Sequence, residues 1–262
     1  MSDTSKVLYE KNGHVAVITM NRPDAMNAFD AEMRDALAQA QQNAEADEDV
    51  RIVVLTGSGR AFSSGTDLKE AATPPGPAGK FDNSVRDYKP LVDGIVKSDK
   101  IYIAAINGFA GGVALGMCLG ADLAIMADDA TVFSPFANIG LVPDGGASWD
   151  LLHSMGYKHA FAAVAEGTRL DAQACLKYGM INKIVPAGDL LQSAKEWAND
   201  LAERAPLSLR YTKQIMRQAA TLSREQTALL ESEYQMKCIN SEDAPTAIMA
   251  FLTKQKPTFK GK

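Results

Sequence analysis

The stretch Ile101-Tyr102-Ile103-Ala104-Ala105-Ile106-Asn107-Gly108-Phe109-Ala110-Gly111-Gly112-Val113-Ala114 decides the fold. Its first six residues are apolar and partly β-branched, which predicts a buried strand. Asn107-Gly108 ends this strand, and a glycine- and alanine-rich segment without proline follows to Ala121, which predicts a helix. The first N–H groups of a helix lack partners within the helix and attract negative charge. The stretch is equally consistent with an anion-binding turn and with a tight turn before a closely packed helix.

Strands and helices alternate outward from this stretch. Short apolar runs at 7–10, 14–20, 51–57, 122–127, 131–133 and 183–186 predict strands. Apolar residues at helical spacing predict helices after Asp30, near 82–97, after Asp171 and over 189–204, 207–220, 223–240 and 243–254. The order strand pair, helix, strand recurs, as in right-handed crossovers. The sequence therefore predicts an α/β fold that ends in a helical region.

A second small-residue loop, Ala61-Phe62-Ser63-Ser64-Gly65-Thr66-Asp67-Leu68, follows the strand at 51–57. Taken alone, it is an ordinary strand-to-helix connection. Because a loop of the same kind follows the next parallel strand, the two loops would direct backbone N–H groups into one crevice. The proline- and glycine-rich run at 74–79 that comes next predicts a surface loop without regular structure.

An acidic residue stands in the turn Gly140-Leu141-Val142-Pro143-Asp144-Gly145-Gly146. Asp144 could cap the helix that follows. It could equally act in proton transfer, because an apolar environment disfavours the charged form of a carboxylate and raises its pKa. Both interpretations of Asp144 remain open from the residues alone.

Composition limits the classes of function. With 262 residues, 46% hydrophobic, the chain is long enough for one large domain, or for a domain with an appendage. The net charge of −5 gives no basic surface for nucleic acid. Three widely spaced cysteines fit neither a disulfide framework nor a metal site. We therefore expect no metal site. We also expect a cytoplasmic protein, because no apolar run reaches membrane-spanning length.

The ordered set of motifs resembles the crotonase superfamily, also called the enoyl-CoA hydratase/isomerase family. The resemblance spans the whole chain, and its most specific parts are 61–68, 104–108, Ala121-Asp122 and 140–146. It implies a crotonase-like spiral of ββα units over 1–190, carrying an acyl-CoA site. It also implies a helical C-terminal region over 191–262 that forms a homotrimer or a dimer of trimers.

The resemblance also implies a mechanism. Members bind acyl-CoA thioesters and stabilise an enolate with two backbone N–H groups, which by position are those of Thr66 and Val113. Members that shift double bonds, and ring-1,2-epoxyphenylacetyl-CoA isomerases, place a single acidic residue where Asp144 stands. The two glutamates of the hydratases fall on Gly116 and Phe136, which carry no proton. We therefore expect an isomerase with Asp144 as its only base and no cofactor, since coenzyme A is part of the substrate.

Other functions remain open. The chain could be an enoyl-CoA hydratase with a non-standard acid and base, or a catalytically inactive acyl-CoA-binding protein. Dehalogenation of the kind some members perform needs a histidine in the helix before Ile101. The histidines are His14, His153 and His159, and none lies there.

Substrate contacts follow more loosely from the same resemblance. Besides the catalytic set, it implies contacts with coenzyme A or the acyl group at Ala25, Met26, Ser64, Gly65, Asp67, Leu68, Gly112, Phe136, Phe251 and Lys254. Phe251 and Lys254 would act partly from a neighbouring subunit. For these two, a core contact and a solvated charge are equally good interpretations. The apolar residues Phe109, Val113, Phe133, Phe136 and Trp149 suggest a lipophilic acyl pocket or simply core.

Overall fold

The computed structural model describes residues 5–72 and 83–262. Within them, the main sheet has six strands. The strand order is β1 (Val7–Asn12), β2 (Val15–Met20), β3 (Ile52–Gly57), β5 (Ile101–Ile106), β7 (Leu123–Ala127) and β10 (Lys183–Val185). Only β1 runs antiparallel to its neighbour. Every residue of β3 and β5 is buried, as expected for strands covered on both faces. The six strands predicted for this sheet are confirmed.

A second, four-stranded sheet carries the loops of interest. Its order is β4 (Ala61–Ser63), β6 (Phe109–Gly111), β8 (Thr131–Phe133) and β9 (Arg169–Asp171). Each of these strands has three residues, too few to show a period of two, and only β8 was predicted. After β3, β5 and β7 the chain crosses in each case to a strand of this small sheet, as the element order shows. This repeated step from the main to the small sheet is the predicted ββα spiral.

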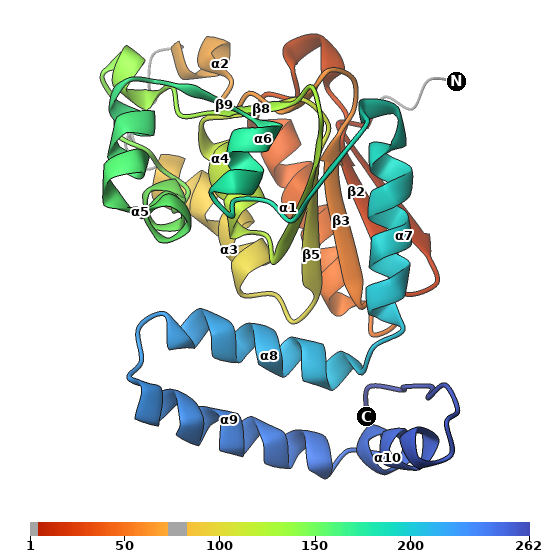
Figure 1. Ribbon diagram of the computed structural model, residues 1–262. Helices are drawn as coiled ribbons and strands as arrows, with labels where there is room; N and C mark the ends of the chain where they lie inside the picture. Colours follow the sequence, from red (N-terminus) through yellow and green to blue (C-terminus); the bar gives the residue numbers. More distant parts are fainter. Residues whose placement is uncertain (1–4, 73–82) are drawn as a thin grey trace.

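Helices cover both faces of the main sheet (Figure 1). On one face lie α1 (Ala31–Ala46), capped by Asp30 as predicted, and α3 (Lys89–Val96). The segment predicted as a helix near 82–97 begins as the π-helix η3 (Asn83–Tyr88), whereas the predicted loop at 74–79 lies outside the described residues. On the other face lies α7 (Leu190–Ala202), with Leu190, Ala194 and Ala198 buried. Although α7 falls in the predicted C-terminal region, it packs on the core.

The other elements before the C-terminal helices lie between and after the strands of the two sheets. They are the 3-10 helices η1 (Pro23–Ala25), η4 (Phe136–Ile139) and η5 (Ala187–Asp189), and the α-helices α2 (Leu68–Ala72), α4 (Val113–Gly120), α5 (Ala147–Ala165) and α6 (Ala172–Lys177). Helix α4 is the one predicted after Asn107-Gly108. It begins six residues later than that turn, because β6 lies between them.

The last three helices form an arm that stands apart from the main body (Figure 1). They are α8 (Pro206–Ala219), α9 (Arg224–Ile239) and α10 (Asp243–Leu252), and the predicted capping box at Ser223 is present. The arm is anchored by the buried Lys213, whose ammonium donates to Ile95 O at 2.9 Å and pairs with Asp122 at 2.9 Å.

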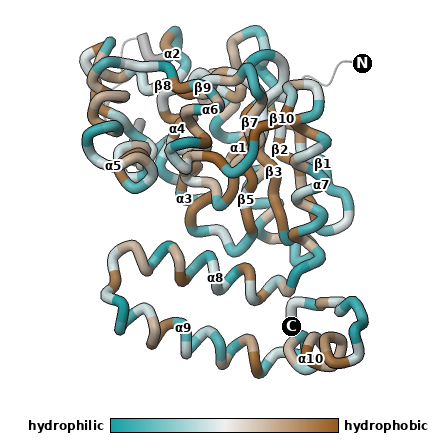
Figure 2. Tube along the Cα trace, in the orientation of Figure 1, coloured by the Kyte–Doolittle hydropathy of each residue, from teal (hydrophilic) through white to brown (hydrophobic). Residues whose placement is uncertain are grey.

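The arm leaves apolar surface exposed. Helix α9 buries no residue, and Leu229 and Met236 are 68% and 52% exposed. Figure 2 shows hydrophobic residues spaced along α9 and gathered in α10. Within the described residues, α9 therefore does not dock on the main body of the same chain. No helix within 5–72 or 83–262 is long and apolar enough to cross a membrane.

Candidate functional site

Two loops that follow neighbouring strands of the small sheet are in direct backbone contact. Gly65 follows β4 and has a φ of +84°, a conformation that favours glycine. A Cβ atom at Gly65 would lie 2.8 Å from Gly111 O and 3.2 Å from Val113 N. The loop after β4 is therefore pressed against the start of α4, as the two small-residue motifs predict.

Within residues 5–72 and 83–262, the N–H groups of Thr66 and Val113 have no hydrogen-bond acceptor. Thr66 forms a parallel bridge with Phe29, in which Phe29 N–H donates to Gly65 O at 2.8 Å and Asp67 N–H donates to Phe29 O at 3.1 Å. Because neighbouring peptide groups alternate in direction, the Thr66 N–H points away from Phe29. Val113 is the first residue of α4, so its N–H has no acceptor within the helix. Because the two loops are in contact, both N–H groups can donate to one negatively charged oxygen.

The first loop is held in place by an ion pair. Arg22 donates to the Asp67 carboxylate at 2.6 Å, and the other carboxylate oxygen accepts from Lys69 N–H at 2.9 Å. The hydrogen bond from Arg22 lowers the pKa of Asp67. Glu70 is similarly engaged, since it accepts from Ala31 N–H at 3.0 Å. The structure thus places Asp67 beside the two donors with its carboxylate already occupied, and its partner Arg22 was not foreseen.

Asp144 does not cap α5, so that interpretation is wrong. The N-cap is Gly146, and no side chain accepts a hydrogen bond there. Ala147 N–H donates to the backbone oxygen of Asp144 at 3.1 Å. Within the described residues, the buried Oδ1 of Asp144 has no hydrogen-bond partner. Burial raises the pKa of Asp144 to about 6, so the carboxyl group can exchange a proton near neutral pH.

The Asp144 turn is packed against α4. A Cβ atom at Gly116 would lie 2.3 Å from Gly145 O, so the turn fills the space into which a side chain at position 116 would project. A Cβ atom at Gly145 would in turn lie 3.1 Å from Cγ2 of Val113. The turn that carries Asp144 therefore lies directly against the first residues of α4. Apart from the two glycines, no local pattern indicated this contact.

A second half-buried carboxylate, Asp150, lies on the first turn of α5. Burial raises its pKa to about 6, and the charges of Arg217 and His153 oppose this rise. Its side chain makes no hydrogen bond or ion pair to any described residue, and its Oδ2 lies 3.8 Å from the position of a Cβ at Gly146. Sequence reasoning missed Asp150, because an aspartate early in a helix is ordinarily a surface residue.

The remaining predicted contacts fall into two groups. Ala25 and Met26 lie beside the first loop, since Ser64 N–H donates to Met26 O at 2.9 Å. Gly112 and Leu68 adjoin the same loops, and Phe136 is buried at the start of η4. By contrast, Phe251 is 83% exposed and Lys254 is exposed at the end of α10, on the arm and separate from the other residues (Figure 1).

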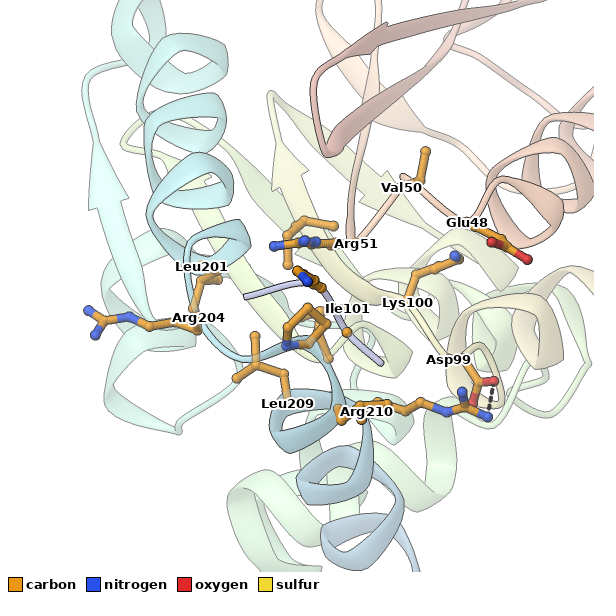
Figure 3. Close-up of a pocket in the computed structure, with 15 residues that line it drawn as sticks. Glu48, Val50, Arg51, Asp99, Lys100, Ile101, Leu201, Arg204, Leu209 and Arg210 are labelled. Atoms are coloured by element: carbon orange, nitrogen blue, oxygen red, sulfur yellow. Dashed lines mark ion pairs between the residues drawn. The ribbon is translucent and has the colours of Figure 1, made fainter. Parts of the chain in front are cut away.

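A pocket of about 140 Å³ lies elsewhere, at the amino ends of β3 and β5 (Figure 3). Its cationic side chains are largely engaged: Arg51 donates to Ala202 O at 2.9 Å, Lys100 to Asp47 O at 2.8 Å, and Arg210 pairs with Asp99 at 2.5 Å. Figure 3 shows the head group of Arg204 directed away from the pocket. The pocket lies at the amino ends of these strands, whereas the loops of Thr66 and Val113 follow their carboxyl ends.

Comparisons with known proteins agree with this architecture. Residues 10–262 match the family model described as enoyl-CoA hydratase/isomerase. The chain is 36% identical over 250 residues to the 1,2-epoxyphenylacetyl-CoA isomerase of Escherichia coli K12, covering 95% of each. It is 34% identical over 257 residues to the carnitinyl-CoA dehydratase of Salmonella typhimurium LT2, covering 96% of this chain and 97% of the relative.

A solved structure extends the comparison to the fold. The crystal structure of an enoyl-CoA hydratase from Polaromonas sp. JS666 superposes with a TM-score of 0.91 at 29% identity, covering 97% of this chain and 99% of that one. With the two donor loops and the Asp144 turn standing where the motifs predict them, the chain belongs to the enoyl-CoA hydratase/isomerase family, the crotonase superfamily.

Proposed function

We propose that this protein is an acyl-CoA isomerase that binds the thioester oxygen at Thr66 and Val113 and moves one proton with Asp144. The observation that carries the proposal is the position of the Asp144 turn. It fills the space beside Gly116 and brings a half-buried carboxylate with a raised pKa to the N-terminus of α4. A single carboxylate beside two free N–H groups is the minimum needed to form and discharge an enolate.

The two donors supply the electrostatic part of the catalysis. Removing a proton next to a thioester places negative charge on the thioester oxygen. Thr66 N–H and Val113 N–H would donate to that oxygen, with the dipole of α4 adding its positive end. A donor of this kind is typically worth about 2.7–4 kcal/mol in the barrier. Both are backbone groups on contacting loops, so they need no reorganisation when the charge develops.

Asp144 would carry the proton. As a carboxylate it takes a proton from C2 of a 3-enoyl thioester, and the C–H electron pair enters the enolate. The resulting carboxylic acid then returns the proton to C4, and the double bond ends between C2 and C3. No water, electron or leaving group is exchanged, so one residue with a pKa of about 6 serves both halves of the reaction. No cofactor is required besides the coenzyme A of the substrate.

The main alternative is addition or removal of water with an unusual pair of acids. One relative is named as a dehydratase, and Asp150 is a second carboxyl group with a pKa raised to about 6. Against this alternative, the positions of the two hydratase glutamates are taken by Gly116, which has no room for a side chain, and by the buried Phe136. We therefore prefer isomerisation.

Turnover against a panel of thioesters separates these reactions. We expect conversion of 3-enoyl-CoA or of a ring-epoxide acyl-CoA, and hydration of crotonyl-CoA slower by about 10²-fold or more, since each missing acid–base group costs about 10²–10⁴-fold. Hydration faster than every isomerisation would contradict the proposal. Binding of all thioesters without turnover of any would favour the inactive acyl-CoA-binding alternative.

We further propose that the arm joins each chain to others in a trimer or a dimer of trimers. The exposed apolar residues of α9 and α10 support this assembly. Phe251 and Lys254, which do not lie near the site of their own chain, could then contact coenzyme A bound to a neighbour. The cytoplasmic location remains a prediction.

A further inference from the structure

A buried hydroxyl group near the donor loops lacks a partner. Tyr88, the last residue of η3, is 2% exposed, and its hydroxyl makes no hydrogen bond within the described residues. Burial raises the pKa of Tyr88, so the phenol keeps its proton at neutral pH. Leaving a buried hydroxyl group unpaired is unfavourable, because the group has lost its hydrogen bonds to water. A ligand that supplied the missing partner would recover this cost.

Tyr88 lies against the strand that carries one of the two donors. Phe29 and Thr66 are bridge partners, and the rings of Phe29 and Tyr88 are 6.3 Å apart at their centroids. Bridge partners present their side chains to the same side, so Thr66 and Tyr88 flank the same phenylalanine ring. The side chains of Thr66 and Arg34 are both close enough to influence the phenol, but neither has hydrogen-bond geometry to it. The Arg34 guanidinium lies 5.6 Å from the centre of the ring.

Helix α3, which follows Tyr88 directly, reaches the Asp144 turn within its first turns. Val92 lies four residues beyond Tyr88, and its Cγ2 is 3.6 Å from the position of a Cβ at Gly145. Four residues advance a helix by about 6 Å. The segment from Tyr88 to Val92 therefore contacts both Phe29, the bridge partner of Thr66, and the turn of Asp144. Val92 is the apolar end of this segment, and the Tyr88 hydroxyl is its polar end.

We propose that the Tyr88 hydroxyl binds an oxygen substituent of the acyl group, and so selects acyl-CoA thioesters that carry an oxygen close to the thioester. This inference rests on the proposed function, because it places the acyl group between Thr66 and Asp144. A hydroxyl, keto or epoxide oxygen can accept from the phenol. An acyl chain of CH₂ groups cannot, and would leave the phenol buried and unpaired.

The test compares binding of butyryl-CoA with that of 2-, 3- and 4-hydroxybutyryl-CoA by calorimetry. We expect the wild-type protein to bind at least one hydroxylated thioester about fivefold or more tightly than butyryl-CoA, the value of one hydrogen bond. Tyr88→Phe keeps the ring and removes the oxygen, and should bring this ratio close to one. The matched control is Tyr102→Phe, since Tyr102 on β5 is also buried with an unpartnered hydroxyl but lies within the main sheet.

Each outcome decides the inference. A ratio that is unchanged in Tyr88→Phe, or a wild-type protein without any preference, overturns it. An equal loss in Tyr102→Phe also overturns it, because the effect would then be a general one of core packing. Binding needs no turnover, so the result is independent of the reaction. If the wild-type protein fails to exchange the α-proton but shows the expected ratios, the proposed function fails and the role of Tyr88 stands.

Discussion

Replacing Gly116 with alanine puts one methyl group between α4 and the turn that carries Asp144. The new Cβ would lie 2.3 Å from Gly145 O and 2.9 Å from Gly145 C, where ordinary contacts begin near 3.4 Å. Both neighbours are backbone atoms, which cannot rotate away as a side chain can. The turn must therefore retreat by about 1 Å, and the Asp144 carboxylate moves with it.

The expected magnitudes separate catalysis from stability. Overpacking of this kind costs about 1–3 kcal/mol, and alanine recovers about 1 kcal/mol in a helix relative to glycine. The free energy of unfolding should therefore fall by no more than about 2 kcal/mol, which leaves the protein folded. A displacement of about 1 Å at a catalytic group can cost about 10²-fold in rate. Gly116→Ala should thus lose most of its activity while retaining its fold.

The assay is exchange of the α-proton of butyryl-CoA with deuterated water, followed by mass spectrometry, with circular dichroism as the check on folding. Gly120→Ala is the matched control on the same helix. Its Cβ would meet Cγ2 of Val96 at 3.2 Å, a side-chain end that can move. An exchange rate in Gly116→Ala within about threefold of that in Gly120→Ala would refute the reasoning. The turn would then not hold the catalytic carboxylate in the way described.

Three further predictions concern stability and assembly. Burial raises the pKa of Asp144 from 3.8 to about 6, so the wild-type protein should lose stability relative to Asp144→Asn as the pH rises from 4 through 6. Urea unfolding of both proteins at pH 4 and pH 8 measures this loss. The same difference in free energy of unfolding at both pH values would contradict the prediction. Lys213→Met removes the buried cation that pairs with the partly buried Asp122, and it should lower the free energy of unfolding by about 3 kcal/mol; a loss below about 1 kcal/mol in urea would show that the anchor of the arm contributes little. Leu229→Glu puts a charge on the exposed apolar face of α9 and should convert trimers to monomers in light scattering; a wild-type monomer at micromolar concentration would exclude the assembly.

Much of the fold could be predicted from local patterns. The main-sheet strands are continuous apolar runs, because both faces of that sheet are covered. The caps at Asp30 and Ser223 are short-range signals and were found as predicted. The strands β4, β6 and β9 could not be found in this way. Each has only three residues, and β6 lies inside a glycine-rich segment, so tertiary pairing rather than propensity defines them.

The candidate site was predictable where it depends on the backbone. Gly65 and Val113 stand at strand ends, and parallel strands bring their ends together. Contacts between distant side chains were not predictable. Neither the ion pair from Arg22 to Asp67 nor the environment of Asp150 leaves a trace in local sequence, because both depend on which elements pack together. The same holds for the unpartnered hydroxyl of Tyr88.

The central claim is that Asp144 is the only base, and exchange of the α-proton in Asp144→Asn tests it most directly. Asparagine keeps the size and polarity of the side chain but cannot accept the proton. In the wild-type protein the exchange rate should rise with pH. It should reach half of its plateau near the pKa of Asp144, which is about 6. In Asp144→Asn it should fall by about 10²-fold or more, with the affinity for butyryl-CoA nearly unchanged. Asp150→Asn, which alters a carboxyl group with a pKa also raised to about 6, is the matched control and should retain the rate. Unchanged exchange in Asp144→Asn, or a loss found only in Asp150→Asn, would contradict the account.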